Sequence, residues 1–503
     1  MHEKTEGAGF RRTVTLLDAT MVVAGIMIGS GIFIVSADIA RNVGSAGWLL
    51  VVWLITGVIT LTGALSYGEL AGMFPQAGGQ YVYLREAYNP LIAFLYGWTF
   101  FLVIQTGSIA AVGVAFAKFT AVLLPVFSET NVVFRVGGIT VSMAQLLAMC
   151  VIVALTWLNT RGIRIGTLVQ NVFTFGKIGS LVVLILLAVI GYNHVAIEQN
   201  MATFWDASRV AVGSDGSVLT TALSGIGLVV ALAVAQVGSL FSSDGWNNIT
   251  FAAGEVVQPR RTIPLALMLG TVIVTVLYLL VNVAYIVTLP VRGVPTGATP
   301  LEQGIQFAAA DRVGAAAAEV MFPGIGAMLM AVLIMISTFG CNNGMILAGA
   351  RCYYAMARDG LFFASVGRLN RVGAPATALW VQALWASVLC LSGRYGDLLD
   401  YVVFAVLVFY VLTVAGIFLL RWQWPDIERP IKAVGYPVLP ALYVVAAAFI
   451  CVVLLVEKPN YTYPGLGIVL AGVPVYYLWR WRATRRGHLL NRNAEVVGQP
   501  ERQ

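Results

Sequence analysis

The sequence predicts an all-α polytopic membrane protein in which twelve helices cross the bilayer and two of them, the first and the sixth, are broken in the middle. The chain of 503 residues is 59% hydrophobic and only 11% charged, with a mean hydropathy of +0.86, and soluble domains do not reach such values. The apolar residues gather in about twelve runs that are long enough to span a membrane. Glycine and polar residues interrupt the first and sixth runs.

The expected spans cross the membrane alternately in each direction. Their approximate bounds are 16–40, 46–72, 91–124, 138–159, 167–191, 222–253, 262–289, 320–350, 374–392, 398–421, 435–456 and 464–482. They divide the chain into a cytoplasmic N-terminal tail (1–15), spans one to five (16–191), spans six to ten (222–421), spans eleven and twelve (435–482) and a cytoplasmic C-terminal tail (483–503).

Basic residues set the expected orientation. With the N-terminus inside, most lysines and arginines fall in cytoplasmic segments, such as Arg11 and Arg12 before the first span and Arg260 and Arg261 before the seventh. This positive-inside bias predicts that both termini are cytoplasmic. The net charge of +7 comes from scattered loop residues, so no nucleic acid partner is expected. We expect an integral protein of the plasma membrane, the inner membrane in a Gram-negative cell, in contact with membrane lipid.

The first span is interrupted at its centre. Gly29, Ser30 and Gly31 stand in the middle of an apolar run and weaken helix continuity. Unwound backbone at this depth is tolerated only where it is buried in protein or lines a cavity. If the helix restarts at Gly31 and runs outward, its free N–H groups face the midplane, where they suit an anionic group. Gly25 and Gly29 also form a GxxxG spacing, so close helix packing is the alternative.

The sixth span is interrupted in the same way. Residues 238–248 are rich in Gly, Ser, Asp and Asn, which compete for backbone hydrogen bonds or tolerate non-helical angles. Since this span runs inward, its outer half ends near Leu240 and Phe241 with unpaired carbonyls, which suit an ammonium group. Two breaks five spans apart indicate an inverted repeat with a site for a zwitterionic amino acid between them. Asp244 either caps the inner half-helix or contacts the amine.

One lysine lies inside an expected span. Lys177 falls about ten residues into span five, roughly 15 Å deep and near the midplane. Intramembrane ionisable residues are functional by default, although a misplaced helix start would put Lys177 at the interface. We expect the hydroxyls of Ser337 and Thr338 in span eight to lie beside it; alternatively, these hydroxyls bond back to their own helix.

Other kinds of site are not indicated. No His/Cys/Asp/Glu cluster has metal-ligand spacing, and the chain has no P-loop or G-x-S-x-G motif. We therefore expect no metal, no cofactor and no catalytic residues, so the protein is not expected to be an enzyme. The five cysteines lie in or beside apolar spans and imply no disulfide framework. A channel or membrane receptor is the alternative from a different class, but the spans hold no ring of charges or repeated filter sequence.

Motifs along almost the whole chain resemble those of the amino acid/polyamine/organocation transporter superfamily, and within it those of the L-type amino acid transporter family. Several motifs occur in the expected order and spacing, which makes the resemblance specific. The matching segments are AGIMIGSGIF (24–33), YGELAGMFPQAGGQYVYLREAY (67–88), FLYGW (94–98), NVFTFGK (171–177), FSSDGWN (241–247), GEVVQPRRTIP (254–264), STFGCNNGMILAGARCYYAMARDG (337–360) and ERPIKAVGYPVLP (428–440).

The resemblance implies a leucine-transporter-type fold of five plus five inverted helices, with helices eleven and twelve added. It implies that the backbone of residues 29–31 holds the substrate carboxylate. It also implies that Phe241, Ser242 and Asp244 hold the amine, and that Phe241 is an aromatic gate. A lysine at the position of Lys177 stands where related sodium-coupled carriers bind an ion, which fits sodium-independent transport.

Two features depart from the animal members of that family. Those that pair with a glycoprotein heavy chain use a cysteine between spans three and four, and residues 125–138 contain none. We therefore expect no disulfide-linked heavy chain and a stand-alone carrier of prokaryotic type. The motifs also leave the side-chain pocket open, where small and apolar residues favour neutral substrates and Asp244 leaves a cationic one as the alternative. These pocket residues are Ile104, Ser108, Val406 and Leu407.

The sequence thus predicts a sodium-independent secondary transporter of L-amino acids, with neutral ones favoured. We expect an exchanger that works by alternating access, in which the substrate bridges the two broken helices. A proton-coupled symporter stays open as an alternative, because a buried lysine could also load and release a proton. A carrier of cationic amino acids or amines is the other alternative within the superfamily.

Overall fold

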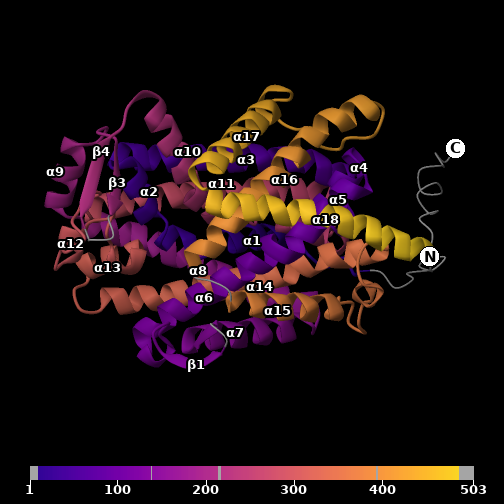
Figure 1. Cartoon of the computed structure of the whole chain (residues 1–503), viewed down its shortest axis with the longest axis horizontal. Helices are drawn as coiled ribbons and strands as arrows, with labels where there is room; N and C mark the ends of the chain where they lie inside the picture. Colours follow the sequence, from indigo (N-terminus) through magenta and orange to yellow (C-terminus); the bar gives the residue numbers. More distant parts are fainter. Residues whose placement is uncertain (1–9, 137–138, 213–216, 392–394, 486–503) are drawn as a thin grey trace.

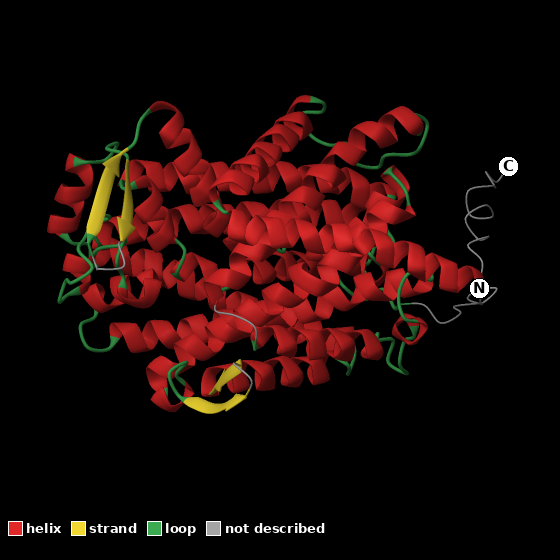
Figure 2. Ribbon diagram, in the orientation of Figure 1, coloured by secondary structure: helices red, strands yellow, loops and turns green. Residues whose placement is uncertain are grey.

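The computed structural model describes residues 10–136, 139–212, 217–391 and 395–485. Helices make up most of the chain and lie side by side along the long axis of the molecule (Figures 1 and 2). The predicted tails before residue 10 and after residue 485 lie outside the described residues. We call the end where α18 (Pro459–Arg485) finishes the inner end, and the end with α9 (His194–Ala202), β3 (Ser208–Val212) and β4 (Val218–Ala222) the outer end.

Most helices correspond to the expected spans. Spans one to five comprise α1 (Leu16–Met27) with η1 (Gly31–Phe33) and α2 (Ser36–Val43), α3 (Ala46–Met73), α5 (Pro90–Thr99) with η2 (Phe100–Ile104) and α6 (Gln105–Leu123), α7 (Met143–Asn159) and α8 (Ile163–Ile190). Spans six to twelve comprise α10 (Gly225–Ser242) with η4 (Trp246–Glu255), α11 (Pro259–Thr288), α14 (Gly326–Arg358), α15 (Ala376–Cys390), α16 (Tyr395–Gln423), α17 (Val438–Glu457) and α18. Within the described ranges, eight spans are long and apolar enough to cross a membrane by length and composition, and α1, α7 and α15 are shorter apolar helices.

Short elements connect the spans. They are α4 (Gln80–Ala87), η3 (Pro125–Phe127), β1 (Val132–Val136), β2 (Ile139–Ser142), α9, β3, β4, α12 (Pro300–Gln303), η5 (Ala309–Asp311), α13 (Val313–Met321) and η6 (Ala364–Gly367). The strands form two antiparallel hairpins, β1 with β2 and β3 with β4. Among the described residues the other connections are helical turns or loops, so this part of the chain is all-α apart from the two hairpins and an isolated bridge between Val14 and Val256.

Two span boundaries differ from the sequence prediction. Span four was expected from residue 138, but residues 139–142 form β2 and the helix begins at Met143. A capping box fixes this start, because the side chains of Ser142 and Gln145 each accept a hydrogen bond from the other's backbone N–H. Span eight was expected at 320–350. The apolar residues there belong to two helices, α13 and α14, separated by a turn that contains Gly324 at φ +87°.

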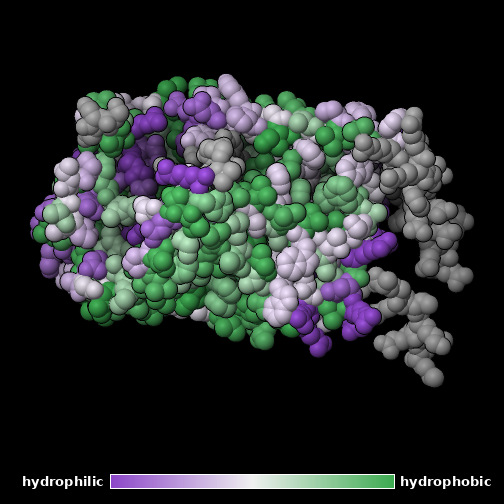
Figure 3. All heavy atoms as spheres, turned by 60° about the horizontal axis from the view of Figure 1, so that its bottom comes forward, coloured by the Kyte–Doolittle hydropathy of each residue, from purple (hydrophilic) through white to green (hydrophobic). Residues whose placement is uncertain are grey.

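The outer surface of the helix bundle is apolar across its middle. Figure 3 shows a broad hydrophobic surface between more polar ends. Exposed large side chains on the helices contribute to this belt, among them Leu168, Val172 and Phe175 on α8 and Val445 and Val452 on α17. Such a belt is the surface that faces lipid in a polytopic protein, and the chain is an integral membrane protein.

Candidate substrate-binding site

The first span is broken in the structure. α1 ends at Met27, residues 28–30 are not helical, and η1 begins at Gly31. Gly29 lies close to α14, since a Cβ on it would stand 3.1 Å from Cys341 Sγ. The N–H groups that open η1 have no preceding helical turn to supply acceptors.

Lys177 is buried beside this break. Its ammonium donates to the carbonyl oxygens of Gly25 (2.7 Å), Ile28 (2.8 Å) and Ser337 (3.0 Å). These acceptors belong to the C-terminal end of α1, the break that follows it, and α14. The lysine therefore joins α8 to the end of α1, to the break that follows α1, and to α14. It is 1% exposed and packed inside the protein, so the alternative position at an interface is wrong.

The hydroxyls of span eight are arranged differently from the sequence prediction. Ser337 offers the lysine its main-chain carbonyl, while its hydroxyl donates to the carbonyls of Ile28 (3.1 Å) and Gly29 (3.0 Å). Thr338 bonds back to carbonyls of its own helix. Consecutive residues of an α-helix point about 100° apart, so only one of the two side chains faces the break.

The second break lies between α10 and η4. α10 ends at Ser242 and η4 begins at Trp246. Gly245 in the intervening turn has φ +83°, the left-handed region that favours glycine, and a Cβ on it would lie 2.4 Å from Ile26 Cγ2 of α1. Trp246 packs edge-on against Tyr67 of α3, with ring centroids 4.7 Å apart. Glycine at this turn thus permits the close approach of the two broken spans.

The two breaks touch each other. A Cβ on Gly31 would stand 2.0 Å from Ser242 Oγ and 2.9 Å from Ser242 Cα, so only glycine fits there. The Tyr278 hydroxyl of α11 lies within hydrogen-bond distance of the carbonyl oxygens of Met27 (2.8 Å) and Ser242 (3.0 Å). These carbonyls end α1 and α10, so one tyrosine fastens the two half-helices together.

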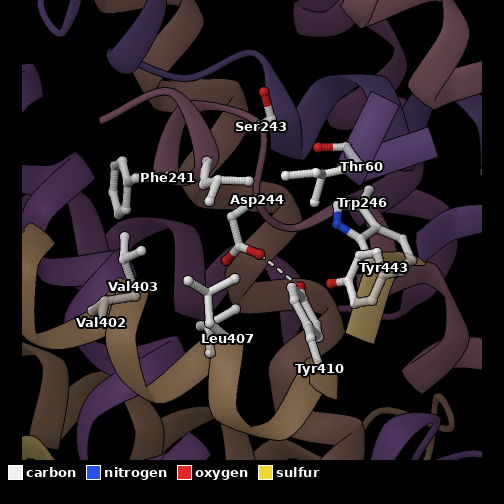
Figure 4. Close-up of a pocket in the computed structure, with 13 residues that line it drawn as sticks. Thr60, Phe241, Ser243, Asp244, Trp246, Val402, Val403, Leu407, Tyr410 and Tyr443 are labelled. Carbon is white, nitrogen blue, oxygen red and sulfur yellow. Dashed lines mark hydrogen bonds between the residues drawn. The ribbon is translucent and has the colours of Figure 1, made fainter. Parts of the chain in front are cut away.

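Asp244 does not cap the inner half-helix. No side-chain hydrogen bond caps η4, whose N-cap residue is Gly245. The carboxylate turns instead toward α16, where its Oδ1 accepts a hydrogen bond of 2.6 Å from the Tyr410 hydroxyl (Figure 4). Asp244 is half-buried, and its carboxylate is held by the Tyr410 hydroxyl and by the backbone N–H of Gly245.

A cavity lies between the two breaks. We call it the inter-break cavity. Residues 29–31 line it from the first break, and Phe241, Ser242 and Asp244 line it from the second. The structure therefore brings the residues expected to bind a carboxylate and those expected to bind an amine to one cavity.

A second cavity shares Phe241 and Asp244 with the first. We call it the aromatic cavity, because Trp246, Tyr410 and Tyr443 line it (Figure 4). Phe241 and Asp244 thus border both spaces, and Phe241 occupies the place of a partition between them.

The four residues expected in a side-chain pocket are divided among these spaces. Ser108 lines the inter-break cavity, and Val406 and Leu407 line the aromatic cavity. Ile104 lines neither cavity. It is the last residue of the π-helical turn η2, and its carbonyl oxygen accepts a hydrogen bond of 2.7 Å from the Ser108 hydroxyl. A π-turn shifts the register of the helix that follows, which sequence periodicity does not reveal.

The sequence reasoning missed the inner wall of the inter-break cavity. Gln105 donates from Nε2 to the Met345 carbonyl (2.7 Å) and to Asn248 Oδ1 (3.1 Å), and all three residues line the cavity. These bonds tie α6, α14 and η4 together. A glutamine inside an apolar span was the available signal, because polar residues within a membrane helix face the protein interior.

A buried ion pair closes the inner end beyond the second break. Arg351 of α14 donates from Nε to Glu255 Oε2 at 2.9 Å, and the two side chains are 1% and 3% exposed. The Glu255 carbonyl also accepts the N–H groups of Thr13 (2.8 Å) and Val14 (2.9 Å). The segment before α1 is thus fastened to the end of η4.

A family model matches most of this chain. It is the model for amino acid permeases, and it matches residues 14–475. The chain belongs to the amino acid permease family. Its match covers all the spans that form both cavities, so the two broken helices belong to the family fold of this permease.

Individual relatives agree with this assignment. The permease is 32% identical over 473 residues to the large neutral amino acids transporter small subunit 2 of Rattus norvegicus, covering 94% of this chain and 81% of the relative. It is 28% identical over 479 residues to the b(0,+)-type amino acid transporter 1 of Mus musculus, with 93% and 88% covered. It is 29% identical over 484 residues to the Asc-type amino acid transporter 1 of Mus musculus, with 95% and 83% covered.

Proposed function

We propose that this permease is a sodium-independent secondary transporter of neutral L-amino acids that exchanges one amino acid for another. The observation that carries the proposal is the contact of two broken helices at one cavity. An amino acid head carries a carboxylate and an ammonium on one carbon. Helix N–H ends attract the first and helix carbonyl ends attract the second. The relatives, which are amino acid transporters by name, support this function.

In this proposal each break binds one charge of the substrate. The amides of residues 29–31 hold the carboxylate. The carbonyl end of α10 at Phe241 and Ser242, together with the Asp244 carboxylate, holds the ammonium. Phe241 is the gate, because it borders both cavities. Bound substrate joins the two half-helices and favours the closed state, from which either side can open.

Sodium independence is supported by the surroundings of Lys177. Its ammonium already supplies a fixed positive charge to three carbonyl oxygens at the first break. A monovalent cation would bind the same kind of oxygen cluster. The lysine therefore makes a coupled sodium ion unnecessary for holding α1, α8 and α14 together.

Counterflow into proteoliposomes tests the proposal. We expect uptake of labelled neutral amino acid to saturate, to rise several-fold when the same amino acid is trapped inside, and to be unchanged when choline replaces sodium. Uptake that requires a proton gradient and gains nothing from internal substrate would establish the symporter instead. Flux that does not saturate would establish a channel.

A carrier of cationic amino acids is the second candidate, and the carboxylate of Asp244 between the two cavities favours it. Competition separates the two. Excess lysine should leave leucine uptake almost unchanged if the site is neutral. If lysine competes as well as leucine, Asp244→Asn should remove the lysine competition while leucine still competes.

We propose further that the carrier works without a disulfide-linked heavy chain and with both termini in the cytoplasm. The five cysteines support the first point, because all are free, four are buried and the exposed Cys150 lies within α7. The relative in rat is named a small subunit, so the point needs a direct test. Extraction from its native membrane should give the same band on reducing and non-reducing gels. Tags on both termini should be protected from protease in sealed cells.

A further inference from the structure

The connection between α6 and α7 exposes several large apolar side chains. Leu124 and Val126 flank the start of η3 and are 53% and 54% exposed, and Val133 and Phe134 of β1 are 48% and 49% exposed. Val133 stands at a register shift between β1 and β2 and has no paired residue in β2. About half of each side chain, Val133 and Phe134, is therefore left uncovered by protein.

The length of α7 sets the depth of this connection. Near the inner end of α7, the Arg161 guanidinium lies 4.4 Å from the ring centroid of Trp157. Tryptophan and arginine are both typical of a membrane interface. From Trp157 back to Met143 a helix rises about 21 Å, whereas the hydrocarbon layer is about 30 Å thick. β2 follows directly before Met143, so the hairpin starts roughly 9 Å inside the outer boundary of that layer, in the upper acyl region.

The outline of the molecule agrees with this depth. In Figure 1 the β1 hairpin lies beside α7 at the lower margin, set back from the outer end that holds α9, β3 and β4. The exposed side of α7, with Val153 and Trp157, belongs to the apolar belt that faces lipid. The apolar residues of η3 and β1 therefore continue a lipid-facing surface.

Polar groups limit how deep this connection lies in the hydrocarbon layer. β1 pairs only with β2 in the described sheet, so its second edge presents unpaired backbone groups, which hydrocarbon does not tolerate. The backbone of Arg135 pairs with Thr140 of β2, while its guanidinium is exposed and has no hydrogen bond or ion pair with another described residue. Apolar side chains beside a cation and an open strand edge match the layer where phosphate groups meet acyl chains.

We propose that η3 and β1 form an interfacial anchor that binds phospholipid in the leaflet at the outer end. Leu124, Val126, Val133 and Phe134 enter the upper acyl region, and Arg135 meets lipid phosphate. The anchor fixes the depth of α6 and α7, which carry the inner wall of the inter-break cavity through Gln105 and pack beside it.

Site-specific fluorescence tests the anchor. In a cysteine-free variant that still transports, a polarity-sensitive label is placed at Val133→Cys, with Thr221→Cys on the exposed strand β4 as the matched control. In phosphatidylcholine and phosphatidylglycerol vesicles, we expect the label at residue 133 to be quenched at least twofold more by a shallow acyl-chain nitroxide than the control. Aqueous iodide should show the reverse order.

Equal iodide quenching at both positions would overturn the proposal. Protection of residue 133 in native membranes but not in pure lipid vesicles would also overturn it, because the cover would then be a protein partner. The unsubstituted chain provides a second measurement. Phospholipids with a photoreactive acyl chain should label the peptide that contains residues 124–135 more than the one that contains residues 218–222, and equal labelling contradicts the anchor.

Discussion

The two broken spans differ in how their free carbonyls are held. At the end of α1, donors from three other helices converge, with Lys177 of α8, Ser337 and Cys341 of α14 and Tyr278 of α11 all bonded to main-chain oxygens. At the end of α10, Tyr278 reaches one carbonyl, and Tyr410 holds the Asp244 side chain. The first break is therefore fixed by a charge inside a rigid scaffold, while the second is fastened mainly through tyrosine hydroxyls.

This difference predicts that the first break is preformed and that the second adapts to the substrate. A site whose carbonyls are already satisfied needs little reorganisation when the substrate carboxylate arrives at the neighbouring amides. A turn held by single hydrogen bonds opens at lower cost, which suits the half-helix that must move during alternating access. Substitutions at the two breaks can separate these roles.

The largest effect is expected for Lys177→Met. The change leaves the carbonyls of Gly25 and Ile28 without their charged donor in a dry interior. Each unsatisfied group costs about 1–3 kcal/mol, so exchange should fall by about 100-fold or more. Counterflow measures it, with Lys118→Met at the outer end of α6 as the control. Near-normal exchange by Lys177→Met would mean that the first break needs no cation.

The second-largest effect is expected for Gly31→Ala. The added methyl would meet Ser242 at 2.0 Å from Oγ and 2.9 Å from Cα, so the two breaks must separate, and we expect substrate affinity to fall by about tenfold or more. Equilibrium binding of labelled amino acid checks this. Gly179→Ala on α8 is the control, because nothing lies within 4 Å of its new methyl. Equal loss in both variants would show that helix context, and not contact between the breaks, is responsible.

The scaffold behind the first break can be tested with two neighbouring asparagines. Asn343 bonds to Asn159 of α7 and to Gly166 and Gln170 of α8. In contrast, neither polar side-chain atom of the buried Asn342 has a hydrogen-bond partner among the described residues.

Asn343→Leu should therefore lower the free energy of unfolding by about 2–4 kcal/mol, whereas Asn342→Leu should leave it unchanged or raise it. Thermal unfolding of the two variants in the same detergent, against the unsubstituted protein, gives the comparison. A larger loss for Asn342→Leu would show that its amide has a partner other than the described residues of this structure.

The smallest effect is expected for Tyr410→Phe. It removes the one hydroxyl bonded to the Asp244 carboxylate and leaves the ring packed against Trp246 at 5.3 Å. A single hydrogen bond of this kind contributes about 0.5–1.5 kcal/mol, so the apparent affinity should change by about two- to tenfold. Concentration-dependent uptake measures the change, with the exposed Tyr463→Phe as the control. A complete loss of transport would contradict an adaptable second break.

Sequence alone indicated the broken spans and the buried lysine. Helix-breaking residues and a charge inside an apolar run affect the backbone at their own positions, so they can be recognised from the sequence. It did not indicate the π-turn before Gln105, which lies inside a continuous apolar run. It also did not indicate the hairpin before α7, whose first strand falls in an expected loop and whose second strand falls at the expected start of span four. It left Asp244 with either a capping role or a contact with the amine, and it did not reveal the partner Tyr410, which lies 166 residues away.

The amino-acid sequence by itself determined where the backbone is left without helical partners. Only the tertiary structure decided which groups meet those open positions, how Ser337 turns relative to Thr338, and that Gly31 and Ser242 lie in contact. The physical reason is the distance along the sequence over which each effect acts. Backbone continuity depends on local conformational preferences, while the partner of a buried polar group is selected by the packing of helices that are distant in sequence.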